Sequence, residues 1–167
     1  FTDASTSDYV VGLVVGQAGP AFYVLDLFRE KTDVIGTMNM IARMHKRHQL
    51  DGTVIELAAS GYAVYQMAKK KVPGMIGFKP ERSKEARAAG IVPVVEAGNV
   101  YLPISSPWLD NFVSEFSLFP ASKNDDQVDA LTMAINYSLQ RVAPQITEVT
   151  WGRGDRPLEG VKRIDIW

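Results

Sequence analysis

Three aspartates, Asp125, Asp126 and Asp129, stand close together in one short segment of the chain. On a helix, Asp125 and Asp129 would be four residues apart and Asp126 and Asp129 three apart, so their like charges would share one face and repel. A cation between them would relieve this repulsion, and the segment therefore predicts a site for a hard metal ion. The alternative is a solvated helix start, since acids suit the positive end of the helix dipole and Asn124 is a good N-cap.

Glu56 is a second candidate carboxylate, because it stands among the apolar residues of a predicted strand. A charged residue there is costly unless it is paired or liganded, and ligands of open α/β sheets gather beyond the carboxyl ends of the strands. If Glu56 converges with Asp125 and Asp126, the three carboxylates form an oxygen-only site for one or two divalent ions. Such a site can activate water and stabilise a leaving phosphate oxygen, which is the chemistry of a phosphodiester-cutting nuclease. The alternative is a glutamate at a solvent-exposed strand end.

Two earlier acids, Asp3 and Asp8, flank the first predicted strand and are further candidate ligands. Asp8 follows Thr6 and Ser7 and is equally plausible as a turn residue. The chain has no cysteine, so any bound metal must use carboxylates, carbonyls or the two histidines. Oxygen ligands of this kind favour Mg²⁺ or Mn²⁺.

Four cations crowd the segment that follows a predicted core strand, where phosphate groups of DNA could be bound. They are Lys79, Arg82, Lys84 and Arg87. The intervening acids Glu81 and Glu85 leave open the alternative of an ordinary solvated face.

Hydrophobic periodicity predicts an α/β order of elements. Strands are expected at 9–15, 22–28, 52–57 and 74–78, helices at 33–49, 62–71, 108–119 and 127–142, and a hairpin at 94–102. The first two strands are joined by a turn, which predicts a hairpin. The alternation of strands and helices that follows is a crossover pattern and predicts a parallel core.

Composition is that of an ordinary globular domain: 167 residues, 46 % hydrophobic and 22 % charged. One domain is the default for this length. The net charge of −1 excludes a strongly basic polyanion binder, so any surface for nucleic acid must be local. We found no apolar run long enough to cross a bilayer and no signal-peptide pattern, and therefore expect a soluble intracellular chain.

Several motifs, in order over about residues 1–140, carry a resemblance to a known family. They are the run 1–11, Tyr23-Val24-Leu25-Asp26, Val54-Ile55-Glu56 with Ala59-Ser60-Gly61, Lys79-Pro80 with Ser83-Lys84 and Arg87-Ala88, the run 96–103, and the run 124–130. Together they resemble the nuclease domain of tailed-bacteriophage terminase large subunits. The resemblance implies an RNase H-like fold with a central mixed β-sheet flanked by helices, over residues 1–142, and a C-terminal tail at 143–167.

The resemblance also implies a function. Members of this family are two-metal DNA endonucleases, using Mg²⁺ or Mn²⁺, that cut concatemeric viral double-stranded DNA during packaging into procapsids. Glu56 matches the family's acid on a central strand, and Asp126, with Asp125 beside it, matches the acid at the head of a late helix. The implied partners are double-stranded DNA, the portal protein, the small terminase subunit and an upstream ATPase domain of the same polypeptide. The implied location is the host-cell cytoplasm at the procapsid portal, and not the mature virion.

Two features depart from the family's pattern. The family usually has its first metal-binding aspartate in an opening strand a few residues ahead of the position of Phe1, so the first strand is expected to be truncated here. Leu57 and Ala58 replace an acid and a lysine that relatives often have after the strand glutamate. The sequence also has no Walker A pattern, and an ATP-driven motor would have to be a separate domain. The alternatives are a RuvC- or RNase H-type nuclease that acts on junctions or hybrids, and a noncatalytic docking domain of the packaging motor.

Overall fold

The structure is a computed structural model, and it describes residues 9–141 and the short strand at 161–163. It begins with the predicted hairpin, formed by β1 (Tyr9–Ala18) and β2 (Ala21–Lys31). These strands are rich in valine, leucine and aromatic residues, which suit a pleated surface. Gly19, with φ of 57°, makes the turn between them. The two strands pair in an antiparallel register from Tyr9 opposite Lys31 to Ala18 opposite Ala21.

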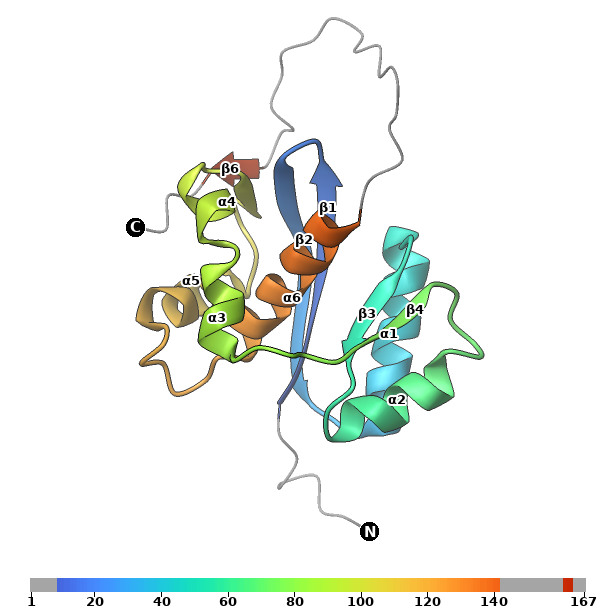
Figure 1. Cartoon of the computed structure of the whole chain (residues 1–167). Helices are drawn as coiled ribbons and strands as arrows, with labels where there is room; N and C mark the ends of the chain where they lie inside the picture. Colours follow the sequence, from blue (N-terminus) through green and yellow to red (C-terminus); the bar gives the residue numbers. More distant parts are fainter. Residues whose placement is uncertain (1–8, 142–160, 164–167) are drawn as a thin grey trace, which may run out of the picture.

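The remaining elements follow the predicted alternation, and Figure 1 shows their arrangement. The strands are β3 (Thr53–Glu56), β4 (Met75–Phe78), β5 (Val100–Pro103) and β6 (Val161–Arg163). The helices are α1 (Val34–His48), α2 (Ser60–Ala68), α3 (Lys84–Ala89), α4 (Val92–Glu96), α5 (Leu109–Leu118) and α6 (Asp126–Gln140). None of these helices, which cover the described part of the chain, is long and apolar enough to cross a membrane.

The strands form two sheets. The larger has the order β1-β2-β5-β6, with β5 parallel to β2 and antiparallel to β6, so it is a mixed sheet. The smaller is the parallel pair β3-β4, in which Glu56 lies opposite Phe78. The predicted α/β fold, with a mixed sheet flanked by helices, is confirmed. The predicted crossover is also confirmed, since α2 connects the two parallel strands β3 and β4.

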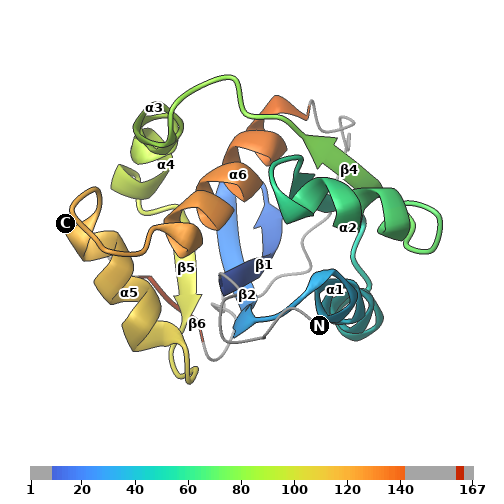
Figure 2. The same ribbon diagram turned by 90° about the horizontal axis from the view of Figure 1, so that it is seen from below.

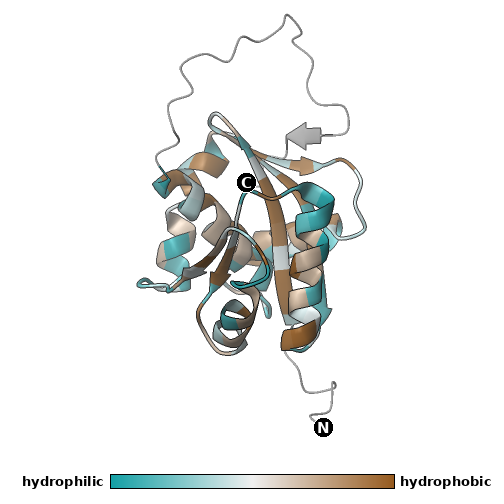
Figure 3. Cartoon of the chain, turned by 90° about the vertical axis from the view of Figure 1, so that its right-hand side faces the viewer, coloured by the Kyte–Doolittle hydropathy of each residue, from teal (hydrophilic) through white to brown (hydrophobic). Residues whose placement is uncertain are grey.

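Helix α6 packs on β1, and α3 and α5 pack against α6, as Figure 2 shows from below. The main core lies between the larger sheet and these helices and contains the fully buried residues Phe22, Leu102, Phe112, Leu131 and Ile135. The strands are mostly hydrophobic in Figure 3, as expected for elements that face this core. Burying such side chains stabilises the fold by about 1.5–3 kcal/mol each, and it fixes α6 over the sheet.

A second, smaller core holds the β3-β4 half of the molecule together. It consists of Ile41, Val64, Ala68 and Val72, with Ile55 of β3 packed against them. Helix α1 begins after Asp33, as predicted, because the Asp33 carboxylate accepts a hydrogen bond from the amide of Gly36. This core positions the end of β3, where Glu56 stands.

A groove of about 800 Å³ separates the two sheets. Consecutive residues 10–17 of β1 line one side and residues 51–55 line the other, while α1 and α6 supply further lining residues. Among the described residues, β1 pairs only with β2 and β3 pairs only with β4. The backbone edges of β1 and β3 therefore both face the groove without a strand partner in the described part of the chain.

Two local predictions were wrong. The expected hairpin at 94–102 is instead the short helix α4 followed by β5. Pro93 near the start of α4 favours a helix there, and Gly98, with φ of 67°, ends the turn that follows. Asn124 was expected to cap the late helix, but the N-cap is Asp125.

Candidate active site

The head of α6 is capped by a side chain from another helix. Glu115 of α5 is buried, with 6 % exposure, and its Oε1 accepts hydrogen bonds from the backbone amides of Gln127 (2.7 Å) and Val128 (3.4 Å). The Gln127 side chain donates to Glu115 Oε2 (2.5 Å) and to Asn111 Oδ1 (2.9 Å). The N-cap residue Asp125 makes no side-chain cap bond. Because Glu115 satisfies two amides of the first turn, the aspartates at this helix end remain available to other partners.

Helix α3 brings two of the predicted cations over this helix end. It begins after Ser83, whose hydroxyl accepts a hydrogen bond from the amide of Ala86 (3.3 Å). The Asn136 side chain of α6 donates to the backbone carbonyl of Arg87 (3.0 Å). This bond fixes the C-terminal half of α3 on α6 and turns Lys84 and Arg87 toward the aspartates.

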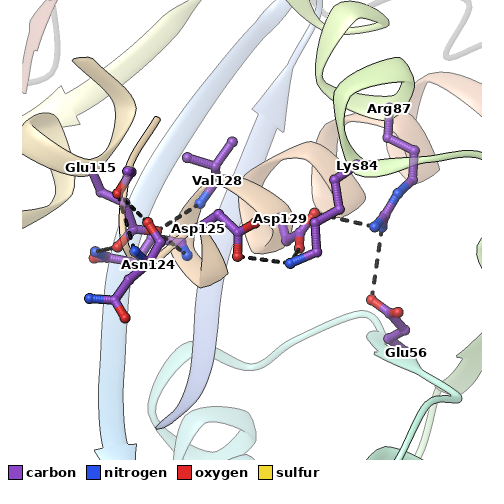
Figure 4. A network of polar contacts seen from close by, with 10 residues as sticks. Glu56, Lys84, Arg87, Glu115, Asn124, Asp125, Val128 and Asp129 are labelled. Carbon is purple, nitrogen blue, oxygen red and sulfur yellow. Dashed lines mark hydrogen bonds and ion pairs between the residues drawn. The ribbon is translucent and has the colours of Figure 1, made fainter. Parts of the chain in front are cut away.

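A continuous line of ion pairs crosses the site, and Figure 4 shows it from close by. Lys84 Nζ lies 2.8 Å from Asp125 Oδ1 and 2.8 Å from Asp129 Oδ2. Arg87 Nη2 lies 3.2 Å from Asp129 Oδ1, and Arg87 Nη1 lies 3.8 Å from Glu56 Oε2. The line therefore joins α6, α3 and the end of β3, which come from three separate parts of the chain.

Glu56 reaches this line from the C-terminal end of β3. The chain turns sharply after it, and a Cβ atom at Gly61 would collide with the Glu56 carbonyl oxygen. Ala59 in the same turn has a positive φ of 45°, which is uncommon for a residue other than glycine. The turn ends the strand so that Glu56 faces Arg87 across the site.

Arg87 is the most buried member of the line, with 9 % of its side chain exposed. Its Nε and Nη1 atoms are buried and have no hydrogen-bond partner among the residues that the structure describes. Its guanidinium is held by charge on two sides, by Asp129 and Glu56. Lys84 is different, because 45 % of its side chain is exposed and its long stem can move into solvent.

The electrostatics of the site raise the pKa of one lysine, Lys84, and of one aspartate, Asp126. Burial lowers the pKa of Lys84, but the hydrogen bonds and charges of Asp125 and Asp129 outweigh it, so the pKa lies above its usual value. Partial burial raises the pKa of Asp126, and the neighbouring charges of Asp125 and Glu115 raise it further. The surroundings of Asp126 therefore disfavour its charged form, and a bound cation would relieve this.

The structure brings together Glu56, Asp125 and Asp129 with Lys84 and Arg87. Asp126 lies beside them in the first turn of α6, and its side chain makes no hydrogen bond or ion pair with another described residue. Lys79 and Arg82 are exposed in the loop between β4 and α3, and they too lack an ion-pair partner among residues 9–141. Asp3 and Asp8 lie outside the described residues.

Glu115, which fixes the head of α6, is a functional residue that was not predicted from the sequence. A signal was present, since Glu115 is the one acid in the apolar stretch Phe112–Phe116 of a predicted amphipathic helix. A lone buried acid implies hydrogen-bond partners. The sequence could not identify those partners, because they stand on a different helix.

The donor chemistry fits a divalent ion in one respect. Mg²⁺ is commonly held by one or two carboxylates together with water and substrate phosphates. Asp125 and Asp129 already hold one cation between them, the Lys84 ammonium, with both distances at 2.8 Å. Within the described residues, however, no group of three or more acids or histidines is close enough to share a metal ion. Asp125 and Asp129 are thus the carboxylates that would hold it, with Asp126 and Glu56 nearby.

The fold and the acids at the ends of β3 and α6 define an RNase H-like domain. The chain matches the family model described as "Terminase RNaseH-like domain" over residues 1–138, and it belongs to that family. Comparisons with curated proteins and with solved structures give no match. The expected resemblance to a terminase nuclease domain is confirmed, and the family indicates a nuclease.

Proposed function

We propose that this domain is a metal-dependent endonuclease that cuts concatemeric viral double-stranded DNA during genome packaging. One observation supports it beyond family membership. Carboxylates from α6 and β3, which are distant in sequence, converge on one partly exposed site. Two of them, those of Asp125 and Asp129, each lie 2.8 Å from the Lys84 ammonium. The carboxylates of such a site are costly together without positive charge between them.

In this proposal Asp125, Asp126 and Glu56 are the catalytic carboxylates, and Asp129 is a further ligand that shares one ion with Asp125. One or two Mg²⁺ or Mn²⁺ ions supply activation of water and stabilisation of the leaving phosphate oxygen. The protein's own residues hold the carboxylates in place. Glu115 fixes the head of α6, which carries the aspartates, and the turn at Gly61 fixes the end of β3, which carries Glu56.

The DNA backbone would approach the side of the site that carries the exposed cations Lys79 and Arg82, on the loop before α3. Lysine and arginine contacts to phosphate give affinity without sequence preference. Arg87 is buried and paired to two acids, so its role in this proposal is to orient Asp129 and Glu56 beside the bound DNA. The portal protein, the small terminase subunit and an upstream ATPase domain are the proposed partners, at the procapsid portal in the host-cell cytoplasm.

The metal site is tested by thermal unfolding with and without Mn²⁺. We expect Mn²⁺ to raise the melting temperature of the wild-type chain, because it binds the native state. Asp126→Ala and Asp125→Asn should each remove most of this increment. Asp110→Asn is the matched control, since Asp110 is an exposed acid in the first turn of α5. An unchanged increment in Asp125→Asn and Asp126→Ala would contradict the assignment.

A noncatalytic docking domain is the rival function, and the internal ion pairs are the observation that favours it. Lys84 and Arg87 already neutralise part of the acidic site. If that arrangement were only structural, Mn²⁺ would give no increment in any form of the protein, including the polypeptide extended upstream.

A further inference from the structure

Lys84 is poorly placed for its own helix. It is the first residue of α3, where the helix dipole is positive and disfavours a cation. Glu85 in the same turn has the favourable sign. The side chain of Lys84 instead reaches across to α6, where its ammonium lies midway between two carboxylates. Its position is therefore explained by the acids of α6 and not by α3.

Within the described part of the chain, no other cation pairs with both carboxylates. Among these residues Asp125 pairs with Lys84 alone, and its side chain makes no cap bond to its own helix. Asp129 is shared with Arg87, whose guanidinium is held in place by burial. Three acids, Glu56, Asp125 and Asp129, thus share two cations in the line of ion pairs, which leaves one negative charge in excess.

The two cations differ in what they can do when another cation arrives. Arg87 is nine-tenths buried between Asp129 and Glu56, and its displacement would leave those acids without their partner. Lys84 is nearly half exposed, so water can solvate its ammonium when it leaves, and a divalent ion would replace the two ion pairs that it gives up. Lys84 is consequently the exchangeable cation of the site.

We propose that Lys84 is an internal competitor for the metal position: its ammonium occupies the space between Asp125 and Asp129, and a divalent ion must displace it to bind there. Lys84 thereby sets the metal affinity of the site. This inference depends on the proposed metal-dependent function. Removal of the Lys84 charge should therefore tighten metal binding.

The first test is titration of Mn²⁺ into the 167-residue chain by calorimetry, with electron paramagnetic resonance of free Mn²⁺ as a second readout. Lys84→Met removes the charge and keeps the length of the side chain. It is expected to bind Mn²⁺ about tenfold more tightly than wild type, the effect of two partly exposed ion pairs. Lys46→Met is the control, because Lys46 is an exposed lysine on α1, outside the line of ion pairs.

The second test needs no variant and decides the matter if Lys84→Met fails to fold. Acetylation of lysines by acetic anhydride is followed by mass spectrometry, with and without Mg²⁺ or Mn²⁺. Paired Lys84 should react slowly in the absence of metal and several-fold faster when metal displaces it, while the reactivity of Lys46 stays constant. A merely structural ion pair would give Lys84 the same reactivity in both conditions.

The possible failures are distinguishable. If Mn²⁺ binds the wild-type chain and Lys84→Met binds it no more tightly, with Lys84 reactivity unaffected by metal, the competitor role is wrong and the proposed function stands. If neither wild type nor Lys84→Met binds Mn²⁺, and the polypeptide extended upstream binds none either, the metal site itself is wrong.

Discussion

Replacing Glu115 with alanine is predicted to destabilise the protein more than any loss of a surface acid. Glu115 is buried, with 6 % exposure, and its carboxylate accepts hydrogen bonds from two backbone amides at the head of α6 and from the Gln127 side chain. Its removal leaves the buried amide of Gln127 without a partner. An unsatisfied buried donor costs about 1–3 kcal/mol, and loss of a helix cap costs about 1 kcal/mol.

The expected loss for Glu115→Ala is therefore about 2–4 kcal/mol, measured by urea unfolding followed by circular dichroism. The melting temperature should fall by about 6–16 °C, from roughly 3–4 °C per kcal/mol for a domain of this size. Glu115→Gln keeps an acceptor oxygen for the amides and should lose less. Glu81→Ala, at an exposed loop position, is the control and should lie within about 0.5 kcal/mol of wild type.

The capping role of Glu115 would be refuted if Glu115→Ala lost less than about 1 kcal/mol, the low end of the cost of one unsatisfied buried donor. Equal losses for Glu115→Ala and Glu115→Gln would also contradict it, since the reasoning depends on the acceptor oxygens and not on packing alone.

Arg87→Met should lower the free energy of unfolding, measured in urea, by about 1–3 kcal/mol. This is less than the roughly 3–5 kcal/mol lost when a fully buried ion pair is broken, because Glu56 is one-third exposed. The loss should be smaller in a Glu56→Gln background. The pKa of Asp126 is raised, so the native state holds that proton more tightly than the unfolded chain does. The metal-free wild type should therefore lose stability as the pH rises from the ordinary aspartate pKa through the raised one. In melts at a series of pH values, Asp126→Asn should lose less stability over the same range. If the polypeptide extended upstream adds a strand between β1 and β3, whose edges both face the groove, amides of both strands should exchange hydrogen more slowly there than in this chain. Equal exchange rates would argue against that position.

Much of the fold could be predicted from local patterns. The hairpin of β1 and β2, the helix after Asp33 and the parallel strands β3 and β4 were each indicated by periodicity and by cap or turn residues. The segment at 94–102 was misassigned because its valines favour strands, whereas Pro93 and contacts of α4 with the core select a helix. Such contacts come from distant parts of the chain, and local propensity does not contain them.

The acids of the site could be predicted from the sequence, but their ion-pair partners could not. Glu56 and the aspartates of α6 were identified from charge in apolar or crowded surroundings. From the sequence, Lys84 and Arg87 were expected to contact DNA together with Lys79 and Arg82, because all four stand in one segment. The structure separates them, since helix α3 turns Lys84 and Arg87 toward α6 and leaves Lys79 and Arg82 in an exposed loop. Side-chain direction on a helix depends on where the helix packs, which the local sequence does not specify.

The most direct test of the proposed nuclease is cleavage of supercoiled plasmid DNA in Mn²⁺. It compares this chain, the polypeptide extended upstream, and the extended polypeptide with Glu56→Ala or Asp126→Ala. The proposal predicts that the extended polypeptide nicks and linearises the plasmid and that either substitution abolishes cleavage. Cleavage that survives both substitutions, or no cleavage by any form, would contradict it.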